Sequence, residues 1–173
     1  RQSMNISKFT QKSVEILNNL EKIAYDFGAQ EIAQEHLLYG MLTVEDSLIK
    51  KLIEKMEIDS DVFLAQVEGA VRKRPQVQGG QVYIGQDLNK VLVYAENEAK
   101  ALGDEYVSVE HLFLSLLRKP SKEIKQLFHD FQIDRERFLQ ALSKVRGNQK
   151  VTTDNPEAVY DSLNKYGYDL VQR

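Results

Sequence analysis

The chain contains no cysteine and no tryptophan, and only three of its 173 residues are proline. Without cysteine, disulfide bonds, thiolate nucleophiles and cysteine-based metal sites are all excluded. The lack of cysteine also suits a reducing compartment, and we expect a cytoplasmic protein. No run of apolar residues approaches the roughly 20 that a membrane-spanning helix needs, so no membrane partner is expected. The fold must therefore be held together by the packing of ordinary side chains.

A surplus of charge of one sign is also missing. Lysine and arginine number 23 and aspartate and glutamate 26, so the net charge is 23 − 26 = −3. Such a balance provides no basic surface for nucleic acid, and no nucleic-acid partner is expected. The basic run RKRP, Arg72 to Pro75, is interpreted as a solvated linker. With 42% hydrophobic and 28% charged residues, the composition is that of an ordinary globular protein.

What the sequence does contain is an internal repeat. The stretch QEHLLYGML, residues 34–42, returns as VEHLFLSLL at residues 109–117. A displacement of 75 positions aligns about 60 residues around this motif without a gap. Residues that are identical at this displacement include the pairs Gly28 and Gly103, Leu52 and Leu127, and Phe63 and Phe138. Agreement over such a length indicates a duplicated structural unit.

Each repeat is predicted to form four helices, which makes the fold class all-α. The first helix begins at a cap, Thr10, follows the 3.6-residue period to Phe27, and ends at Gly28, where a positive φ is expected. The other predicted helices span residues 35–42, 47–56, 60–71, 87–102, 109–117, 121–131 and 134–146. Caps are expected at Asp59 or Ser60, at Ser108 and at Asp134, and a weaker one at Gly85. Because one unit of about 65 residues has a thin core, the two repeats are expected to pack as a pseudo-symmetric pair.

These elements divide the chain into five segments. The predicted segments are residues 1–3, a tag remnant before Met4; 4–74, repeat 1; 75–84, the inter-repeat linker; 85–147, repeat 2; and 148–173, a second linker that leads into a helix. That helix is expected to start near Pro156, since proline fits the first turn. An amphipathic helix at the very end of the sequence suggests a piece of a larger protein.

Both repeats resemble the Clp repeat, the duplicated helical module at the N-terminus of Clp chaperones. The resemblance rests on KFTQKSVEIL and EHLL in repeat 1, and on AKALGDEYVSVEHLFLSLL in repeat 2. Within that family, the stretches RKRPQVQGG and VTTDNPEAVYDSLNKYGYDLV are similar to the ClpB branch of disaggregase chaperones. No phosphate-binding loop of the form GxxxxGKS or GxxxxGKT occurs in the sequence, so this chain is not expected to be an enzyme.

The resemblance implies the substrate-recognition domain of an ATP-dependent disaggregase. Such a domain would bind exposed hydrophobic segments of unfolded or aggregated polypeptides and pass them to its own hexameric AAA+ ring. ATP and Mg would belong to ATPase modules outside this chain, so no cofactor is expected within it, and the isolated domain is expected to be monomeric. The alternative is a module that docks one folded adaptor protein, as in the ClpC and ClpA branch of protease-associated chaperones.

The pairs Glu35-His36 and Glu110-His111 raise a catalytic or zinc hypothesis. Zinc-binding helices typically carry histidines four residues apart, as in HExxH, and that pattern is absent. A nucleophilic site needs Ser or Thr beside a base and an orienting acid, and the spacing indicates no such set. We therefore predict no catalytic residue and no metal ligand. The glutamates are interpreted as first-turn charges that favour the positive helix end, and the histidines as packed, hydrogen-bonded residues.

Polypeptide capture requires an apolar groove with a polar rim instead of a reactive group. Grooves are expected where the repeats meet and near helix N-termini, where backbone N–H groups are exposed. Asp104 is aligned with Ala29, and Tyr94 is aligned with Asn19, when the repeats are superimposed in sequence. Positions at which the repeats differ in this way are candidates for a functional face. The candidate polypeptide-binding residues are Thr10, Leu88, Tyr94, Asp104, Glu110 and His111.

Overall fold

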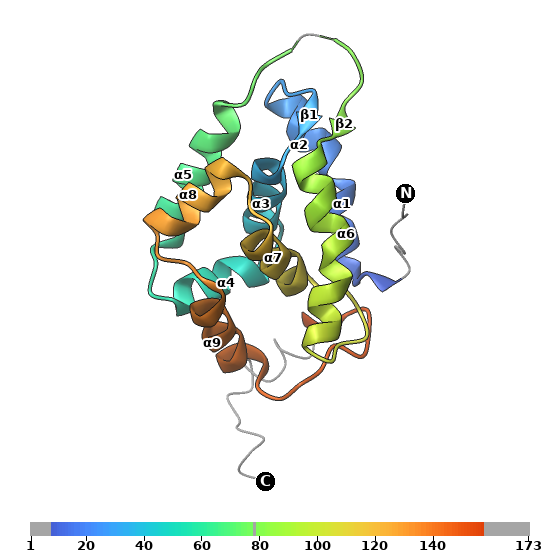
Figure 1. Ribbon diagram of the computed structural model, residues 1–173, viewed down its shortest axis with the longest axis vertical. Coiled ribbons are helices and arrows are strands. Elements are labelled where there is room, and N and C mark those ends of the chain that lie inside the picture. Colours follow the sequence, from blue (N-terminus) through green and yellow to red (C-terminus); the bar gives the residue numbers. More distant parts are fainter. Residues whose placement is uncertain (1–7, 78, 158–173) are drawn as a thin grey trace.

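Both repeats are bundles of short helices in the computed structural model, which describes residues 8–77 and 79–157 (Figure 1). Repeat 1 comprises α1 (Gln11–Asn18), α2 (Leu20–Asp26), the strand β1 (Glu31–Ile32), α3 (Gln34–Thr43), α4 (Leu48–Lys55) and α5 (Ser60–Arg72). The second half comprises β2 (Tyr83–Ile84), α6 (Gln86–Ala101), α7 (Val109–Arg118), α8 (Lys122–Asp130) and α9 (Arg135–Arg146). The predicted all-α fold class is confirmed, since each strand is only two residues long.

The first helix of repeat 1 differs from the prediction because it is interrupted at Asn19. The Asn19 N–H donates to the carbonyls of Ile16 and Leu17, which are closer along the chain than the α-helical partner would be. Asn18 and Asn19 are both poor helix formers, which favours a break at this point. The aligned residue of repeat 2, Tyr94, lies inside the unbroken α6. The prediction of one continuous helix is therefore wrong in this respect.

Three helices begin at capping side chains that the sequence predicts, whereas Ser108, the N-cap of α7, directs its hydroxyl to Glu110. The side chains of Thr10, Asp59 and Asp134 each accept a hydrogen bond from a backbone N–H in the first turn of α1, α5 and α9. Gly28 and Gly103 follow α2 and α6 with positive φ values of 72° and 71°. The two repeats therefore share their local backbone as well as their sequence pattern.

Gly85 is the N-cap of α6 and, as predicted, makes no side-chain capping bond. A side chain at this position would collide with the carboxylate of Glu31. That carboxylate lies at the N-terminal end of α6, where the helix dipole favours negative charge. Glycine at position 85 thus makes room for an acidic group that repeat 1 provides.

The repeats are joined by a backbone contact that is itself duplicated. β1 pairs with β2 in parallel, with Ile32 opposite Ile84. A second parallel bridge joins Phe9 and Val107. Because 84 − 9 = 75 and 107 − 32 = 75, the two bridges are one contact made twice, with the repeats exchanged. The predicted pseudo-symmetric pair is confirmed, and each repeat completes the edge of the other.

The core lies along the seam between the repeats, where α3 and α7 occupy the centre of the molecule (Figure 1). Leu37 of α3 and Leu112 of α7 are fully buried. The ring of Phe113 stacks on Phe138 of α9 with its centroid 4.5 Å away. One continuous hydrophobic cluster contains residues of both repeats, as expected if neither unit alone encloses enough apolar surface.

The segment after α9, residues 147–157, is called the tail here, and it lies against both repeats. The Val151 N–H donates to Asp104 Oδ1 at 3.0 Å, and the Val151 carbonyl accepts from the Glu105 N–H at 2.8 Å. The N–H of Gln11, at the start of α1, donates to the Asp154 carbonyl at 2.7 Å. Part of the predicted second linker is therefore held by specific hydrogen bonds.

Two sequence predictions fall on other parts of the chain. The proposed tag remnant, residues 1–3, and almost all of the helix predicted from Pro156 lie outside the described residues. Within the described ranges, no helix is long and apolar enough to cross a bilayer.

Candidate functional site

The two histidines of the repeated motif close the N-terminal ends of α3 and α7. His36 Nδ1 accepts a hydrogen bond from the Ala33 N–H at 2.8 Å, and His111 Nδ1 accepts one from the Ser108 N–H at 2.7 Å. In the usual capping box a Glu or Gln has this role. Because Nδ1 is an acceptor in both rings, each neutral imidazole carries its proton on Nε2. The partner of that Nε2 proton distinguishes the two repeats.

In repeat 2 the proton on His111 Nε2 meets a buried carboxylate. Nε2 donates to Asp104 Oδ2 at 2.7 Å, and Asp104 Oδ1 accepts from Arg146 Nη2 at 2.5 Å. Arg146 Nη1 donates to Glu110 Oε2 at 3.1 Å, and the Ser108 hydroxyl donates to Glu110 Oε1. We call these five side chains the Asp104 network. They connect the loop after α6, the start of α7 and the end of α9.

The Asp104 network has the properties of a structural cluster. All of its members are buried. Burial by itself raises the pKa of Asp104, but hydrogen bonds from His111 and Arg146 outweigh it and lower that pKa to about 2. A carboxylate held ionised by two such donors is a poor general base at neutral pH. Nor do the described residues include any group of three or more His, Asp or Glu that could hold a metal ion.

The tail places a third carboxylate, Glu157, beside the two of this network. The Ser108 hydroxyl lies 3.4 Å from Glu157 Oε2, and the Glu157 side chain is buried. Burial and the charge of Glu110 raise the pKa of Glu157 to about 7. The protonation of Glu157 near neutral pH therefore bears on how firmly the tail is held.

Repeat 1 lacks the central carboxylate of the network. Since 104 − 29 = 75, Ala29 occupies the position of Asp104. His36 is fully buried, and its Nε2 has no hydrogen-bond partner among the described residues. Burial and the charge of Arg74 lower the pKa of His36 to about 4. Burial also raises the pKa of Glu35, whose Oε2 lies 3.9 Å from Arg74 Nη1.

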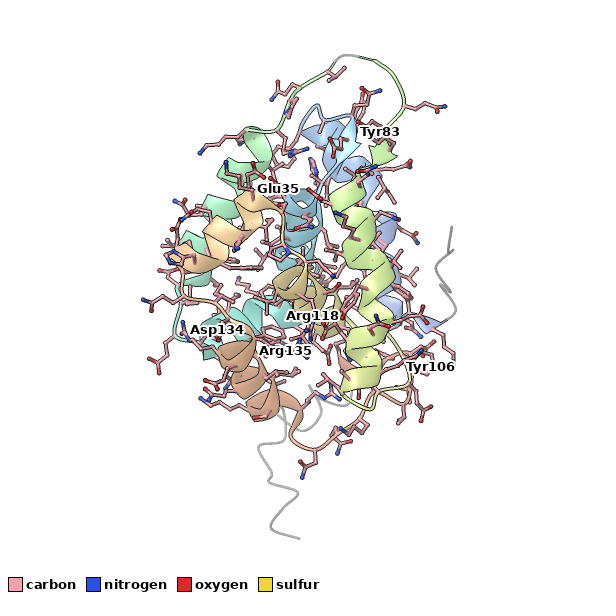
Figure 2. All side chains as sticks on the ribbon, in the orientation of Figure 1. Glu35, Tyr83, Tyr106, Arg118, Asp134 and Arg135 are labelled. Atoms are coloured by element: carbon pink, nitrogen blue, oxygen red, sulfur yellow. The ribbon has the colours of Figure 1, made fainter. Side chains whose placement is uncertain are left out.

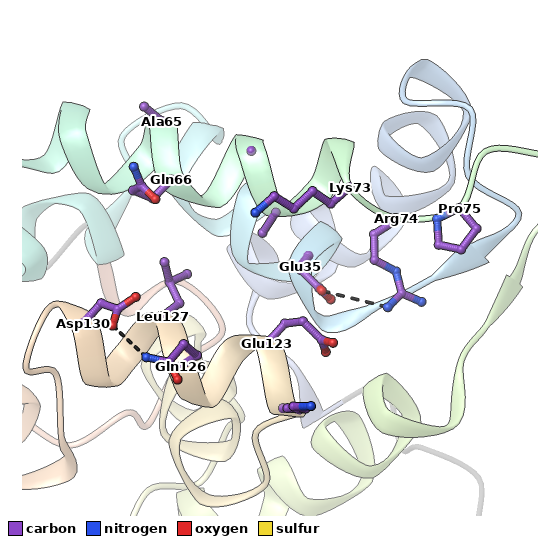
Figure 3. Close-up of a pocket in the computed structure, with 13 residues that line it drawn as sticks. Glu35, Ala65, Gln66, Lys73, Arg74, Pro75, Glu123, Gln126, Leu127 and Asp130 are labelled. Atoms are coloured by element: carbon purple, nitrogen blue, oxygen red, sulfur yellow. Dashed lines mark hydrogen bonds and ion pairs between the residues drawn. The ribbon is translucent and has the colours of Figure 1, made fainter.

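A cleft of about 650 Å³ opens close to these residues, between α5 of repeat 1 and α8 of repeat 2 (Figure 3). Its floor consists of small or apolar residues: Ala65, Gly69 and Ala70 of α5, and Leu127, which points from α8 toward α5. Charges of both signs surround this floor. The charged residues that line the cleft are Glu35, Lys73, Arg74, Lys122, Glu123 and Asp130. Such a surface can accept apolar side chains of an extended polypeptide.

The cleft is open because the repeats differ along the seam. By the displacement of 75, α5 and α8 correspond to α9 and α4. That second pair is bridged by Arg137 of α9, which donates from Nη2 to the Met56 carbonyl, whereas α5 has Val62 at the aligned position. Shorter side chains on α5 also replace longer ones on α9: Ala65 for Gln140, Gly69 for Lys144 and Ala70 for Val145.

Gln34 positions the α8 wall of the cleft, and sequence reasoning did not identify it. Its side chain is almost fully buried. Nε2 donates to the carbonyls of Asp87 and Lys119, both at 2.9 Å, and Oε1 accepts from the N–H of Ser121, the N-cap of α8, at 2.8 Å. The sequence did contain an indication that Gln34 has a special role: polar Gln34 is aligned with apolar Val109 inside an otherwise matched motif.

Four of the six predicted polypeptide-binding residues lie near one another. Asp104, Glu110 and His111 belong to the Asp104 network. Thr10 lies across the repeat boundary, and its N–H donates to the Val107 carbonyl at 3.0 Å. All four side chains are buried and bonded within the protein.

Leu88 and Tyr94 lie on α6, separate from the network. Leu88 is fully buried in the core. Tyr94 is half-buried, with Arg118 Cζ 5.8 Å and Lys119 Nζ 5.0 Å from its ring centroid. Arg118, near the centre of Figure 2, also donates to the buried Glu98 at 2.7 Å. None of the six predicted residues lines the α5–α8 cleft, and their contact with a polypeptide stays a prediction.

The duplicated helices, the exchanged bridges and the seam cleft define a class of protein: a two-repeat helical module of the kind found at the N-termini of Clp chaperones. The chain belongs to the Clp repeat (R) N-terminal domain family, whose sequence profile matches residues 8–131. The family resemblance inferred from the repeated motif is confirmed.

The sequence is also similar to the N-terminal part of longer chaperones. It is 42% identical over 175 residues to the chaperone protein ClpB of Nitratidesulfovibrio vulgaris, covering 98% of this chain and 20% of that protein. It is 39% identical over 173 residues to the chaperone protein ClpB of Bacillus cereus, covering 97% of this chain and 20% of that protein. The chain thus spans about one fifth of the length of these relatives.

Solved structures share the fold at low sequence identity. The Hsp104 N-terminal domain from Candida albicans superposes with a TM-score of 0.75 at 20% identity, covering 86% of this chain and 97% of that one. A complex of the ClpV N-domain with a VipB peptide superposes with a TM-score of 0.65 at 20% identity, covering 80% and 86%. At such identities the likeness establishes the fold alone.

Proposed function

We propose that this chain is the N-terminal substrate-recognition domain of a ClpB-like ATP-dependent disaggregase. In this proposal the α5–α8 cleft binds exposed apolar segments of unfolded or aggregated polypeptides. The observation that carries the proposal is the cleft itself, which has an apolar floor and charges of both signs around it, at the seam of the two repeats. Weak affinity is expected, because such a domain must accept many sequences and release them.

The composition of the cleft supports a polypeptide as its occupant. Leu127 and Ala70 provide apolar surface that a bound side chain would cover, and Gly69 leaves the α5 backbone open to close approach. Charges of both signs at the rim do not select for one net charge in the ligand. One structural neighbour is a ClpV N-domain in complex with a VipB peptide, which supports peptide binding by a domain of this fold.

The larger assembly follows from the chaperone relatives and is part of the proposal. This chain would be joined to AAA+ modules that bind ATP and Mg, form a hexameric ring and thread the captured polypeptide. The chain itself would hold no cofactor and catalyse no reaction. The whole protein would act in the cytoplasm on unfolded or aggregated polypeptides, and the isolated domain would be monomeric.

The test is an NMR titration of the isotopically labelled chain with a permanently unfolded polypeptide. Substrate capture predicts shift changes at the amides of Ala65, Ala70 and Leu127, and competition by unrelated unfolded chains. The alternative, docking of one folded adaptor, predicts no response to unfolded chains. No shifts with any unfolded chain would therefore reject the proposal.

Tyr94 offers a separate test of the predicted binding residues, because it is the member of that set whose side chain is partly exposed. If it takes part in capture, Tyr94→Ala weakens binding of the unfolded chain without changing the stability of the fold appreciably. An unchanged Kd for this variant would remove Tyr94 from the binding surface.

A further inference from the structure

The Nε2 atom of His36 is a buried hydrogen-bond donor with no acceptor in the part of the chain that the structure describes. His36 is fully buried, and its Nδ1 accepts from the Ala33 N–H, which places the ring proton on Nε2. Among the described residues nothing accepts that proton. Buried polar groups are nearly always hydrogen-bonded, so this donor requires an explanation.

The other half of the molecule shows what such a donor binds. His111 has the same place in its repeat and the same capping bond, and its Nε2 donates to Asp104 Oδ2 at 2.7 Å. The other oxygen of that carboxylate accepts from Arg146. Ala29 stands at the aligned position, so repeat 1 has a methyl group where repeat 2 has the carboxylate.

Repeat 1 nevertheless supplies a guanidinium. Arg74 Nη1 lies 3.9 Å from Glu35 Oε2, and Arg74 Nη2 lies 3.2 Å from Glu31 Oε1. In repeat 2, Arg146 is likewise bonded to Glu110, which aligns with Glu35. Its Nε is buried and has no acceptor among the described residues. The glutamate, histidine and arginine of the Asp104 network therefore all have counterparts in repeat 1, and the carboxylate does not.

We propose that repeat 1 binds a carboxylate from outside the chain beside Ala29, with His36 Nε2 and the Arg74 guanidinium as its donors. Arg74 already faces two carboxylates, Glu35 through Nη1 and Glu31 through Nη2, so the added carboxylate is assigned to its Nε, which has no acceptor among the described residues. Glu31 is partly exposed to solvent, and along the same side Lys73 and Lys122 add positive charge while Glu123 and Asp130 add negative charge. Arg74 is itself partly exposed, so a ligand can reach its guanidinium from solvent.

The site adjoins the cleft, because Arg74 and Glu35 both line it (Figure 3). A polypeptide in the cleft would therefore place an acidic side chain or its C-terminal carboxylate at this end. That assignment of the ligand's source rests on the proposed function. Binding of a simple carboxylate does not, so the two can fail separately.

The experiment is a titration of the ¹⁵N-labelled chain with acetate against chloride at constant ionic strength, followed through the histidine ring nitrogens. Acetate is expected to shift the His36 ring signals and to leave those of His111 in place, because Asp104 already occupies that site. His129, exposed on α8, reports any non-specific effect. Equal responses of His36 and His111, an identical effect of chloride, or no response would overturn the proposal; the last result would mean that a water molecule satisfies His36.

Variants at position 29 provide the matched pair. Ala29→Asp is expected to abolish the acetate response and to give His36 the ring signals of His111, and Ala29→Asn, of the same size and with an amide oxygen that can accept from Nε2, should abolish the response as well. Asp104→Ala should create the same acetate response at His111. An undiminished acetate response in Ala29→Asp would contradict the site.

Peptides distinguish the two sources of the carboxylate. Three forms of one apolar peptide are titrated. The first has a free C-terminus, the second an amidated C-terminus, and the third an amidated C-terminus and an internal aspartate. A shift at His36 with the first or the third identifies the source. If acetate shifts His36 and no peptide binds, the carboxylate site stands and the proposed function fails.

Discussion

Two histidines in the same sequence context show how strongly one neighbouring residue changes the hydrogen bonding of a side chain. His36 and His111 form the same capping bond, but among the described residues only His111 has a carboxylate, Asp104, for its second nitrogen. Because Ala29 has only a methyl group at the position of Asp104, the His36 Nε2 donor is buried without an acceptor among the described residues. An unsatisfied buried donor typically costs about 1–3 kcal/mol. Stability is therefore expected to be distributed unequally between the two repeats.

Asp104→Asn is expected to lower the free energy of unfolding by about 3 kcal/mol at neutral pH, because it leaves Arg146 and His111 without their shared anion. The pKa of Asp104 is lowered from 3.8 to about 2, so its stabilising effect is complete above pH 3.8 and is lost as the pH falls through about 2. Urea unfolding at a series of pH values measures both effects. Asp130→Asn, at an exposed position, is the control, and equal losses in the two variants would contradict the role of the network.

His36→Gln is expected to change how stability depends on pH. The pKa of His36 is lowered from 6.5 to about 4, so the unfolded chain binds an extra proton between those values and stability falls as the pH falls. Removing the imidazole should reduce that slope by up to about 1.4 kcal/mol per pH unit. Urea unfolding from neutral pH downward measures it, with His129→Gln on the surface as the control. Parallel curves for wild type and His36→Gln would show that His36 titrates normally.

At the scale of elements, α5 and the tail break the symmetry of the two repeats. α5 has shorter side chains than its counterpart α9, and the cleft results from that difference. The tail is bonded to the loop before α7 and to the start of α1, so it contacts both repeats.

Gly69→Ala should stabilise the protein by about 0.5–1 kcal/mol, because glycine in a helix interior is less favourable than alanine. A Cβ at Gly69 meets no atom within 4 Å. Gly40→Ala is the opposite case, since its Cβ would lie 3.2 Å from Ile23 Cδ1 in the core. Thermal unfolding of both variants checks the prediction. Destabilisation by Gly69→Ala would mean that α5 is packed against something at this point.

Glu157→Gln should remove a pH dependence from the attachment of the tail. Because the pKa of Glu157 is raised from 4.5 to about 7, its neutral form favours the docked tail, and docking is strongest below pH 4.5 and weakens as the pH rises from there through about 7. Hydrogen exchange of the Val151 and Glu105 amides, corrected for intrinsic rates, should quicken above this pH in wild type. The variant should stay protected, whereas Glu105→Gln, an exposed control, should behave as wild type. Equal protection of wild type on both sides of pH 7 would contradict the prediction.

Much of the architecture could be predicted from periodicity, capping residues and the repeat. The caps at Thr10, Asp59 and Asp134 and the glycine turns are local features, and each was found where the sequence placed it. The exchanged bridges could not be predicted in detail, because a lone extended residue such as Ile32 does not specify its partner. The break at Asn19 arises from a balance of weak propensities that a helical pattern hides.

The candidate site was less accessible to sequence reasoning. Aligning the repeats drew attention to Asp104, which the structure places at the centre of a buried network. The cleft depends on the small side chains of Ala65, Gly69 and Ala70. Small residues in a helix do not by themselves predict a binding site. The alignment of the repeats does indicate the cleft, because each of these small residues is aligned with a larger residue of α9.

Binding of an unfolded polypeptide by three proteins tests the role of the cleft: wild type, Gly69→Trp and Val62→Trp. Both substitutions place the same indole on α5, but position 69 lines the cleft, whereas Val62 is 50% exposed outside it. Fluorescence anisotropy of a labelled unfolded chain gives each Kd, and thermal unfolding confirms that the variants are folded. If the cleft is the binding site, Val62→Trp matches wild type and Gly69→Trp binds at least about tenfold more weakly, a loss of about 1.4 kcal/mol. The same Kd for all three proteins would contradict it.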